Sequence, residues 1–169
     1  HPDALTYMAG TVSARVRPVT VQRAYGNHAT FGEARSIELG TESDVVLMRQ
    51  DPPFDMQYIA ATHLLESIHG VGEGQTFCVN HPGHVRNAPE KILVTEFAEF
   101  MPPTMISRSV EDITAFRDKY RDIIVKPLFG NGGAGVFHLK PDDENLTSLL
   151  ETLLLTSREQ LMIQAYLPA

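Results

Sequence analysis

Four glycines stand within six residues between Gly130 and Gly135, two residues after the apolar run Ile123–Pro127. Their spacing matches G-x-G-x-x-G, which occurs in dinucleotide-binding turns, in other loops that cover phosphates and in flexible hairpin tips. A dinucleotide-binding turn must open a helix, because the N-terminus of that helix holds the pyrophosphate. Here Val136–Leu139 favours a strand, and Pro141 blocks a continuation. The stretch therefore predicts a β-hairpin with a glycine-rich tip and excludes the dinucleotide-binding turn.

Lys126 lies in the apolar strand that leads into these glycines. A buried ammonium group is costly without a partner. A phosphate would supply one through charge-assisted hydrogen bonds, worth about 1.5–3 kcal/mol each. The residues therefore favour a loop that covers phosphates, and the alternative is a loose hairpin turn with a lysine that extends to solvent.

The composition bounds the class of protein. The 169 residues are 43% hydrophobic and carry a formal net charge of −7, enough apolar material for one full core or two small ones. There is no basic footprint for nucleic acid, and no apolar run approaches the roughly 18–20 residues that span a bilayer. We therefore expect a soluble, cytoplasmic protein, with Cys78 as a small buried hydrophobic residue. Because the chain begins at His1 and stops just after an apolar segment, we expect an internal piece of a longer protein.

The first half predicts a hairpin followed by a βαβ unit. Alternating apolar residues over 12–16, after a turn at 9–10, indicate the hairpin. The continuous apolar run Val45–Met48 predicts a strand buried on both faces of a parallel sheet. Asp55 should cap a helix that ends at Gly70, and the run TFCVN should return as the second parallel strand. The polar residues 24–42 carry little signal.

The second half predicts an α+β layer in which a sheet packs against helices. Asn87, Pro89 and Glu90 form a variant of the capping box and predict a helix that runs to the Pro102–Pro103 break. The expected order beyond this break is β-α-β-loop-β-α-β. Its strands are TMIS, DIIVKP, VFHLK and LMIQAY, and its helices are VEDITAFRDKY and residues 143–155.

Five stretches occur together along the chain, namely LMRQDPPFD, CVNHPGHVRNAPEK, MPPT, DIIVKPLFGNGGAGVF and QAYLP. Their order and spacing resemble the prokaryotic-type glutathione synthetases, which belong to the ATP-grasp ligases. The resemblance covers about residues 8–169 and is dense from Asp44 onward. It implies an α/β fold whose second part is α+β: a Rossmann-like pre-ATP-grasp domain over 1–88, without its first strand and helix, and the first half of an ATP-grasp domain over 89–169.

The resemblance also implies a reaction. Such enzymes use ATP and Mg²⁺ to phosphorylate the cysteinyl carboxylate of γ-glutamylcysteine, and the amine of glycine then attacks the acyl phosphate. The magnesium ligands of the family are expected beyond Ala169, so we expect no metal site and no activity in this piece alone. His81 and His84 are a weak zinc signal. Another ATP-grasp carboxylate–amine ligase and a non-catalytic nucleotide-binding module stay open as alternatives, and so does a homo-oligomer.

Site residues follow from the same resemblance. Lys91 resembles a first phosphate-facing lysine, although a solvated helix lysine paired with an acid is the other interpretation. Lys126 resembles the second phosphate-facing lysine, which contacts the α- and β-phosphates. The glycine loop from Gly130 to Gly135 would be a mobile cover over the β- and γ-phosphates. The segment 164–167 matches a strand whose backbone groups border adenine, with core packing as the other interpretation for its last two residues. The residues expected to bind ATP are Lys91, Lys126, Gly130, Asn131, Gly132, Gly133, Gln164, Ala165, Tyr166 and Leu167.

The proline loop after Val45–Met48 is the expected peptide-substrate side. Arg49 flanks this loop with Asp51 and Asp55 at the carboxyl end of a predicted parallel strand, where open α/β sheets bind ligands. Arg49 is the candidate substrate contact. The competing interpretation is structural, with Asp55 as a helix cap and Arg49 in an ion pair at a domain interface. The same two interpretations, substrate contact and structural role, apply to Asn80 and Arg86.

Overall fold

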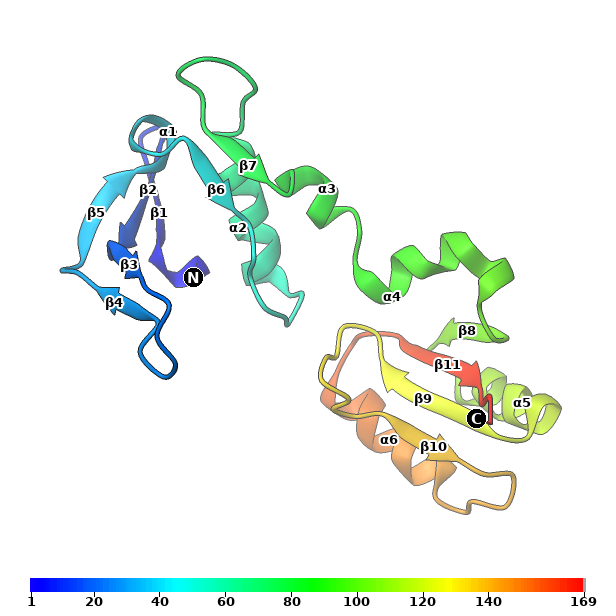
Figure 1. The fold of residues 1–169 in the computed structure, drawn as a ribbon. Coiled ribbons are helices and arrows are strands. Elements are labelled where there is room, and N and C mark those ends of the chain that lie inside the picture. Colours follow the sequence, from blue (N-terminus) through cyan, green and yellow to red (C-terminus); the bar gives the residue numbers. More distant parts are fainter. Residues whose placement is uncertain (169) are drawn as a thin grey trace. The chain divides into compact units, whose positions relative to one another are not determined.

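The structure is a computed structural model that describes residues 1–168 (Figure 1). The chain divides into two compact units, of which the first is His1–Asn87 and the second begins at Ala88. Each unit has its own cluster of buried apolar residues. Across residues 1–168, every helix is too short or too polar to cross a bilayer.

The first unit combines antiparallel and parallel strand pairs. Its elements are η1 (Pro2–Ala4), β1 (Leu5–Met8), β2 (Thr11–Val16), β3 (Val19–Val21), β4 (Ala29–Phe31), β5 (Arg35–Glu38), α1 (Leu39–Glu42), β6 (Val45–Leu47), α2 (Met56–Glu66), β7 (Phe77–Val79) and α3 (Pro82–Arg86). The predicted hairpin is β1–β2, and Ala9 and Gly10 in its turn both have positive φ. β2 also pairs with β5, and β3 pairs with β4. The residues 24–42 therefore contribute two strands that the sequence pattern did not indicate.

The βαβ unit is present as predicted, because β6 and β7 are parallel and α2 connects them. Asp55 caps α2 by accepting the Tyr58 N–H at 2.9 Å. One expectation was wrong: β6 is not buried on both faces, since Val45 and Leu47 are 52% and 64% exposed. Among the described residues the core of this unit packs on one face of the β6–β7 pair, where Val46 lies.

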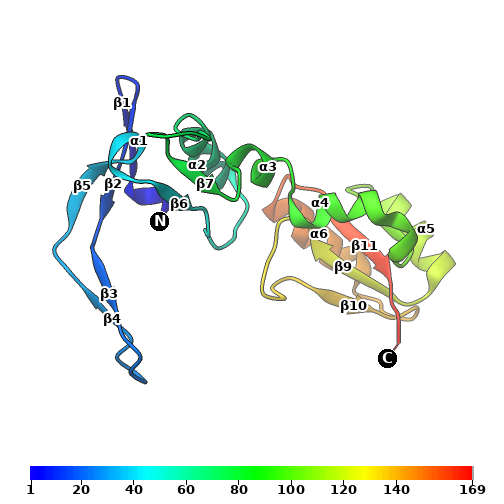
Figure 2. The same ribbon diagram turned by 45° about the horizontal axis from the view of Figure 1, so that its top comes forward.

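The second unit is a four-stranded antiparallel sheet with helices. Its elements are α4 (Glu90–Leu93), η2 (Val94–Phe100), β8 (Thr104–Ser107), α5 (Val110–Tyr120), β9 (Ile123–Pro127), β10 (Phe137–Leu139), α6 (Leu146–Thr156) and β11 (Leu161–Ala165). The strand order is β10–β9–β11–β8. Both α5 and α6 pack on one face of this sheet, where they form a single apolar core with β9 and β11 (Figures 1 and 2). This arrangement confirms the predicted α+β layer.

The capping box predicted at Asn87 was wrong. Asn87 instead ends the short helix α3, with its N–H donated to the Gly83 carbonyl at 3.1 Å. Pro89 stands at the N-cap of α4 and offers no side-chain cap. The predicted long helix also breaks, because α4 ends at Leu93 and Phe97 has the non-helical angles φ −114° and ψ 40°. The sequence rule failed because it did not anticipate a helix immediately before Asn87.

Candidate functional site

The sheet of the second unit has one face turned away from α5 and α6, and polar side chains cross it in register. Side chains alternate between the two faces of a strand, so Ile124 and Lys126 share this face of β9. Ile124 stands opposite His138 on one side and Gln164 on the other. Gln164 in turn stands opposite Thr104 of β8. One residue from each of four adjacent strands therefore forms a row across this face, namely His138, Ile124, Gln164 and Thr104. Lys126 lies next to this row, two residues after Ile124 on β9.

Lys126 is held on this face by a neutral side chain. Its Nζ donates to Gln164 Oε1 at 2.6 Å, and Gln164 Nε2 donates to Thr104 Oγ1 at 2.9 Å. Burial lowers the pKa of Lys126, and the nearby Lys91 lowers it further, whereas Glu90 acts in the opposite direction. Among residues 1–168, Lys126 forms no ion pair. Its charge is therefore still available to a ligand.

The glycine loop joins β9 to β10, which pair antiparallel, so the predicted hairpin with a glycine-rich tip is confirmed. Gly132, Gly133 and Gly135 have φ of +60°, +77° and +70°. Residues other than glycine rarely adopt this region of backbone conformation. A Cβ at Gly135 would also lie 2.9 Å from Pro127 Cγ. The tip therefore requires glycine for its backbone conformation and, at Gly135, for space.

Lys91 comes to the same place from α4. Its Nζ donates to the Gly130 carbonyl, and in the described part of the chain it forms no ion pair with an acid. Lys91 and Lys126 line a cavity of about 240 Å³ together with Glu90 and the loop. The remaining lining residues are Pro127, Gly130, Asn131, Gly132, Gly133, Ala134 and Val136. Two ammonium groups beneath a glycine-rich turn suit an anionic ligand with several oxygen acceptors.

The segment 164–167 uses part of its backbone within the unit. The Ala165 N–H donates to the Pro103 carbonyl and the Tyr166 N–H to the Asp122 carbonyl, each at 2.9 Å. Within the described residues, the amide of Leu167 has no such partner. The Tyr166 ring stacks on His138, with centroids 4.1 Å apart and planes at 24°. Of these three amides, that of Leu167 is therefore the one still available to a ligand.

His138 and Asp122 flank this segment, and neither was expected from the sequence. His138 Nε2 lies 3.3 Å from Asp122 Oδ1, while its ring supports Tyr166. The alternation of VFHLK places His138 on the face turned away from α5 and α6, but the strand register that brings it to Tyr166 is visible only in the structure.

Arg49 and Asp51 lie in the first unit, where they line a different cavity of about 460 Å³. Arg15 contributes a second guanidinium group to its lining, and Val46 and Leu65 are among the apolar side chains there. Arg49 therefore lies in a cavity with mixed polar and apolar lining, as a contact to a peptide would require.

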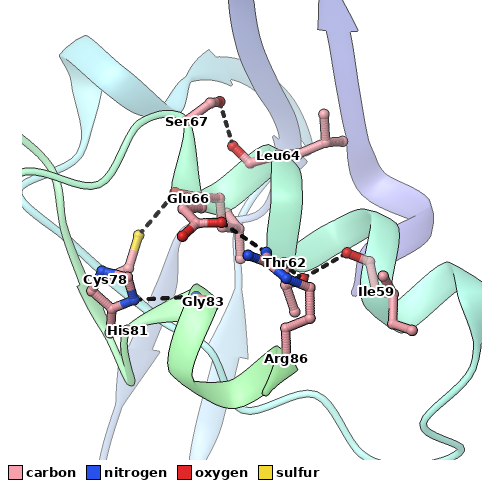
Figure 3. A network of polar contacts seen from close by, with 10 residues as sticks. Ile59, Thr62, Leu64, Glu66, Ser67, Cys78, His81, Gly83 and Arg86 are labelled. Carbon is pink, nitrogen blue, oxygen red and sulfur yellow. Dashed lines mark hydrogen bonds and ion pairs between the residues drawn. The ribbon is translucent and has the colours of Figure 1, made fainter.

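Arg86 has a structural role (Figure 3). Its Nη1 lies 2.7 Å from Glu66 Oε2 and 3.3 Å from Thr62 Oγ1, which ties α3 to α2. The hydrogen bond from Arg86 lowers the pKa of Glu66. His81 caps α3 by accepting the Gly83 N–H at 3.1 Å, as Figure 3 also shows.

Cys78 is 1% exposed, and its Sγ lies 3.5 Å from the Leu65 carbonyl. Burial raises the pKa of the thiol, so the expectation of a small buried residue is confirmed. In the part of the chain that the structure describes, no group of three or more His, Cys, Asp and Glu side chains is placed to hold a metal ion.

Comparison with known proteins matches both units to one family. The model for the N-terminal domain of prokaryotic glutathione synthetase matches residues 1–86, and the model for its ATP-grasp domain matches residues 90–169. The glutathione synthetase of Brucella melitensis is 53% identical over 166 residues, which are 98% of this chain and 52% of that protein. That of Salmonella typhimurium is 40% identical over 160 residues, or 95% of this chain and 50% of that protein. The chain thus spans about half the length of these relatives.

Solved structures show the same fold. D-cycloserine synthetase DcsG has a TM-score of 0.56 at 20% identity and covers 76% of this chain and 45% of its own. A RimK domain ATP-grasp protein from Sphaerobacter thermophilus has a TM-score of 0.55 at 19% identity, with coverage of 75% and 47%. Identities this low show the fold alone, and it is the ATP-grasp fold that the sequence predicted. The two domain models, which match nearly the whole chain, and the identity to these relatives show that the chain belongs to the prokaryotic glutathione synthetase family.

Proposed function

We propose that this chain serves ATP-dependent synthesis of glutathione from γ-glutamylcysteine and glycine. In this role its second unit provides half of the ATP clamp, and its first unit provides the peptide-substrate side. The observation that carries the proposal is the cavity in which Lys91 and Lys126 lie beneath the glycine loop, in a chain of this family. The domain division at about residues 88–89 and the cytoplasmic location stay predictions.

The lysines and the loop would act by position and charge. Lys126 would hold the α- and β-phosphates, Lys91 would approach from α4, and the loop from Gly130 to Gly133 would cover the β- and γ-phosphates with backbone N–H groups. Phosphoryl transfer needs aligned reactants and neutralised charge, and both ammonium groups supply charge. The closed loop would also keep water away from the acyl phosphate until glycine attacks.

Bond changes in this reaction balance without a redox partner. A carboxylate oxygen of the cysteinyl residue attacks the γ-phosphorus, the bond to the β-phosphate oxygen breaks, and ADP leaves. The glycine amine then attacks the acyl carbon and loses a proton to phosphate or solvent, and inorganic phosphate leaves with the pair of electrons from the broken C–O bond. Mg²⁺ bound to ATP would neutralise phosphate charge, and we assign no residue of this chain to hold it.

Two further contacts belong to the proposal. The segment Gln164–Leu167 would border adenine through the backbone of Leu167 and the face of Tyr166, which His138 supports. Arg49 would contact a carboxylate of the peptide, because its cavity combines a cation with apolar walls.

The proposal is tested by ADP release from the full-length protein. We expect release only when γ-glutamylcysteine, glycine and Mg-ATP are present together, with glutathione formed in equal amount. Reactions that lack one substrate, and reactions with other amino acids in its place, are the controls. Release that needs other substrates would assign a different ATP-grasp ligase. ATP binding without any release would indicate a nucleotide-binding module.

A further inference from the structure

We infer that the Gln164 side chain is a positioning residue that aims Lys126 at the phosphates, and that Thr104 fixes the orientation of Gln164. This inference rests on the proposed function, because it concerns how the same site holds ATP. It assigns to the Gln164 side chain a role behind the lysine, in place of contact with the nucleotide base.

The direction of each hydrogen bond supports this role. The Pro102 carbonyl can only accept, so the Thr104 hydroxyl donates to it at 2.7 Å. The Thr104 oxygen then has its lone pairs free, and it accepts from Gln164 Nε2 at 2.9 Å. This bond turns Gln164 Oε1 toward Lys126 Nζ, 2.6 Å away. The backbone at Pro102 thus determines which end of the amide meets the lysine.

The location of Gln164 supports the same role. Lys126 lines the cavity beneath the glycine loop, whereas Gln164 and Thr104 are absent from its described lining. The strand register places Gln164 beside β9 and Thr104 beyond it, at the far side of β11. The two side chains therefore reach Lys126 from within the sheet, and their effect on a ligand in the cavity must pass through its ammonium group.

Neutrality is what makes glutamine suited to this position. A carboxylate would hold Lys126 equally well, but it would also neutralise the charge that a phosphate needs. The glutamine oxygen engages one of the three donors of the ammonium group and leaves the other two available. The lowered pKa of Lys126, which burial and Lys91 cause, agrees with a cation that has no opposite charge bound to it.

The main test is Gln164→Glu in the full-length protein, because this change keeps the size of the side chain and adds a charge. We expect the affinity for ATP at neutral pH to fall by about tenfold or more, while the affinity for adenosine, which has no phosphate, is unchanged. The new carboxylate would raise the pKa of Lys126, so the remaining ATP affinity should persist to higher pH than in the unchanged protein. Calorimetry of both ligands across a pH series gives both readouts.

Thr104→Val provides a second test that adds no charge. It removes the hydroxyl but keeps the branched shape, so Gln164 loses its orientation, and we expect ATP affinity to fall about three- to fivefold. Thr104→Ser keeps the hydroxyl and should restore the affinity. This pair keeps the inference testable if Gln164→Glu does not fold, which circular dichroism and thermal denaturation would show.

Three results would contradict the inference. Equal losses for ATP and adenosine in Gln164→Glu would show that the side chain contacts the base. Unchanged ATP affinity in both Gln164→Glu and Thr104→Val would show that neither side chain matters. A failure of the unchanged full-length protein to bind ATP would refute the proposed function itself, and the inference with it.

Discussion

Two partly buried cations, one in each unit, are held in opposite ways. In the first unit Arg86 meets the carboxylate of Glu66 at 2.7 Å and the hydroxyl of Thr62. In the second unit Lys126 donates to the amide oxygen of Gln164 and forms no ion pair within residues 1–168. The first cation is neutralised where it joins two helices, whereas the second keeps its charge at the edge of a cavity. The contrast indicates which cation serves the fold and which serves a ligand.

Removing the uncompensated cation is the strongest test of this comparison. In the full-length protein we expect Lys126→Ala to reduce ATP affinity or turnover by more than about tenfold, because charge-assisted bonds to phosphate are lost. The melting temperature should not fall, since partial burial of an ammonium group without an opposite charge costs stability. Isothermal calorimetry and steady-state assays measure these effects. Unchanged affinity and rate would remove the phosphate role of Lys126.

The glycine loop gives the next largest effect. Gly132 has φ +60° with open space around it, so Gly132→Val should slow turnover through backbone strain and not through a clash. Gly26→Val is the matched control, because Gly26 has φ +73° with open space around it but does not line the cavity. We expect the rate to fall severalfold only in the Gly132 variant, with its melting temperature little changed. Unfolding of that variant would show that the loop is structural.

Arg86, the cation that is paired with Glu66, should affect stability and not ATP binding when it is replaced. Arg86→Met breaks the link between α2 and α3, so we expect the melting temperature to fall by a few degrees and ATP affinity to stay unchanged. Hydrogen exchange should show the loss of protection in α2 and α3. Weaker ATP binding without a change in stability would reverse the two assignments.

The ion pair between Arg86 and Glu66 predicts a small dependence of folding stability on pH. Arg86 lowers the pKa of Glu66 in the folded state, so the folded protein releases this proton more readily than the unfolded chain. The contribution of Glu66 to stability is therefore complete above its unfolded pKa and is lost as the pH falls through the lower folded value. Arg86→Met should flatten this part of the stability profile, as denaturant titrations between neutral and acid pH would show.

Local patterns were sufficient for elements whose signals lie within a few residues. The hairpin turn at Ala9 and Gly10, the Asp55 cap and the strand Ile123–Pro127 all follow from neighbours along the chain. The cap at Asn87 failed because the residues just before it form a competing helix. The prediction that the strand at Val45 is buried on both faces failed, because an apolar run indicates hydrophobicity and not which elements are present to cover it.

The residue types of the candidate site were predictable from the sequence, whereas the hydrogen bonds between them were not. The spacing of the glycines and the place of Lys126 in an apolar run favour a phosphate-binding loop on local sequence alone. The role of the Gln164 side chain was not foreseen, because it depends on the register between β9 and β11. Neighbours across a sheet are far apart in sequence, and a single chain without relatives gives no signal for that register.

The strand order of the second unit has a consequence for folding. β11 lies between β8 and β9 although it follows both in the sequence. Among the described strands β8 pairs only with β11, so β8 can join the sheet only after residues 161–165 have been synthesised. The local hairpin β9–β10 can form early, whereas the long loop that β8–β11 pairing closes makes that step slow. Lys126 therefore acquires its glutamine partner in the same late step that completes the sheet.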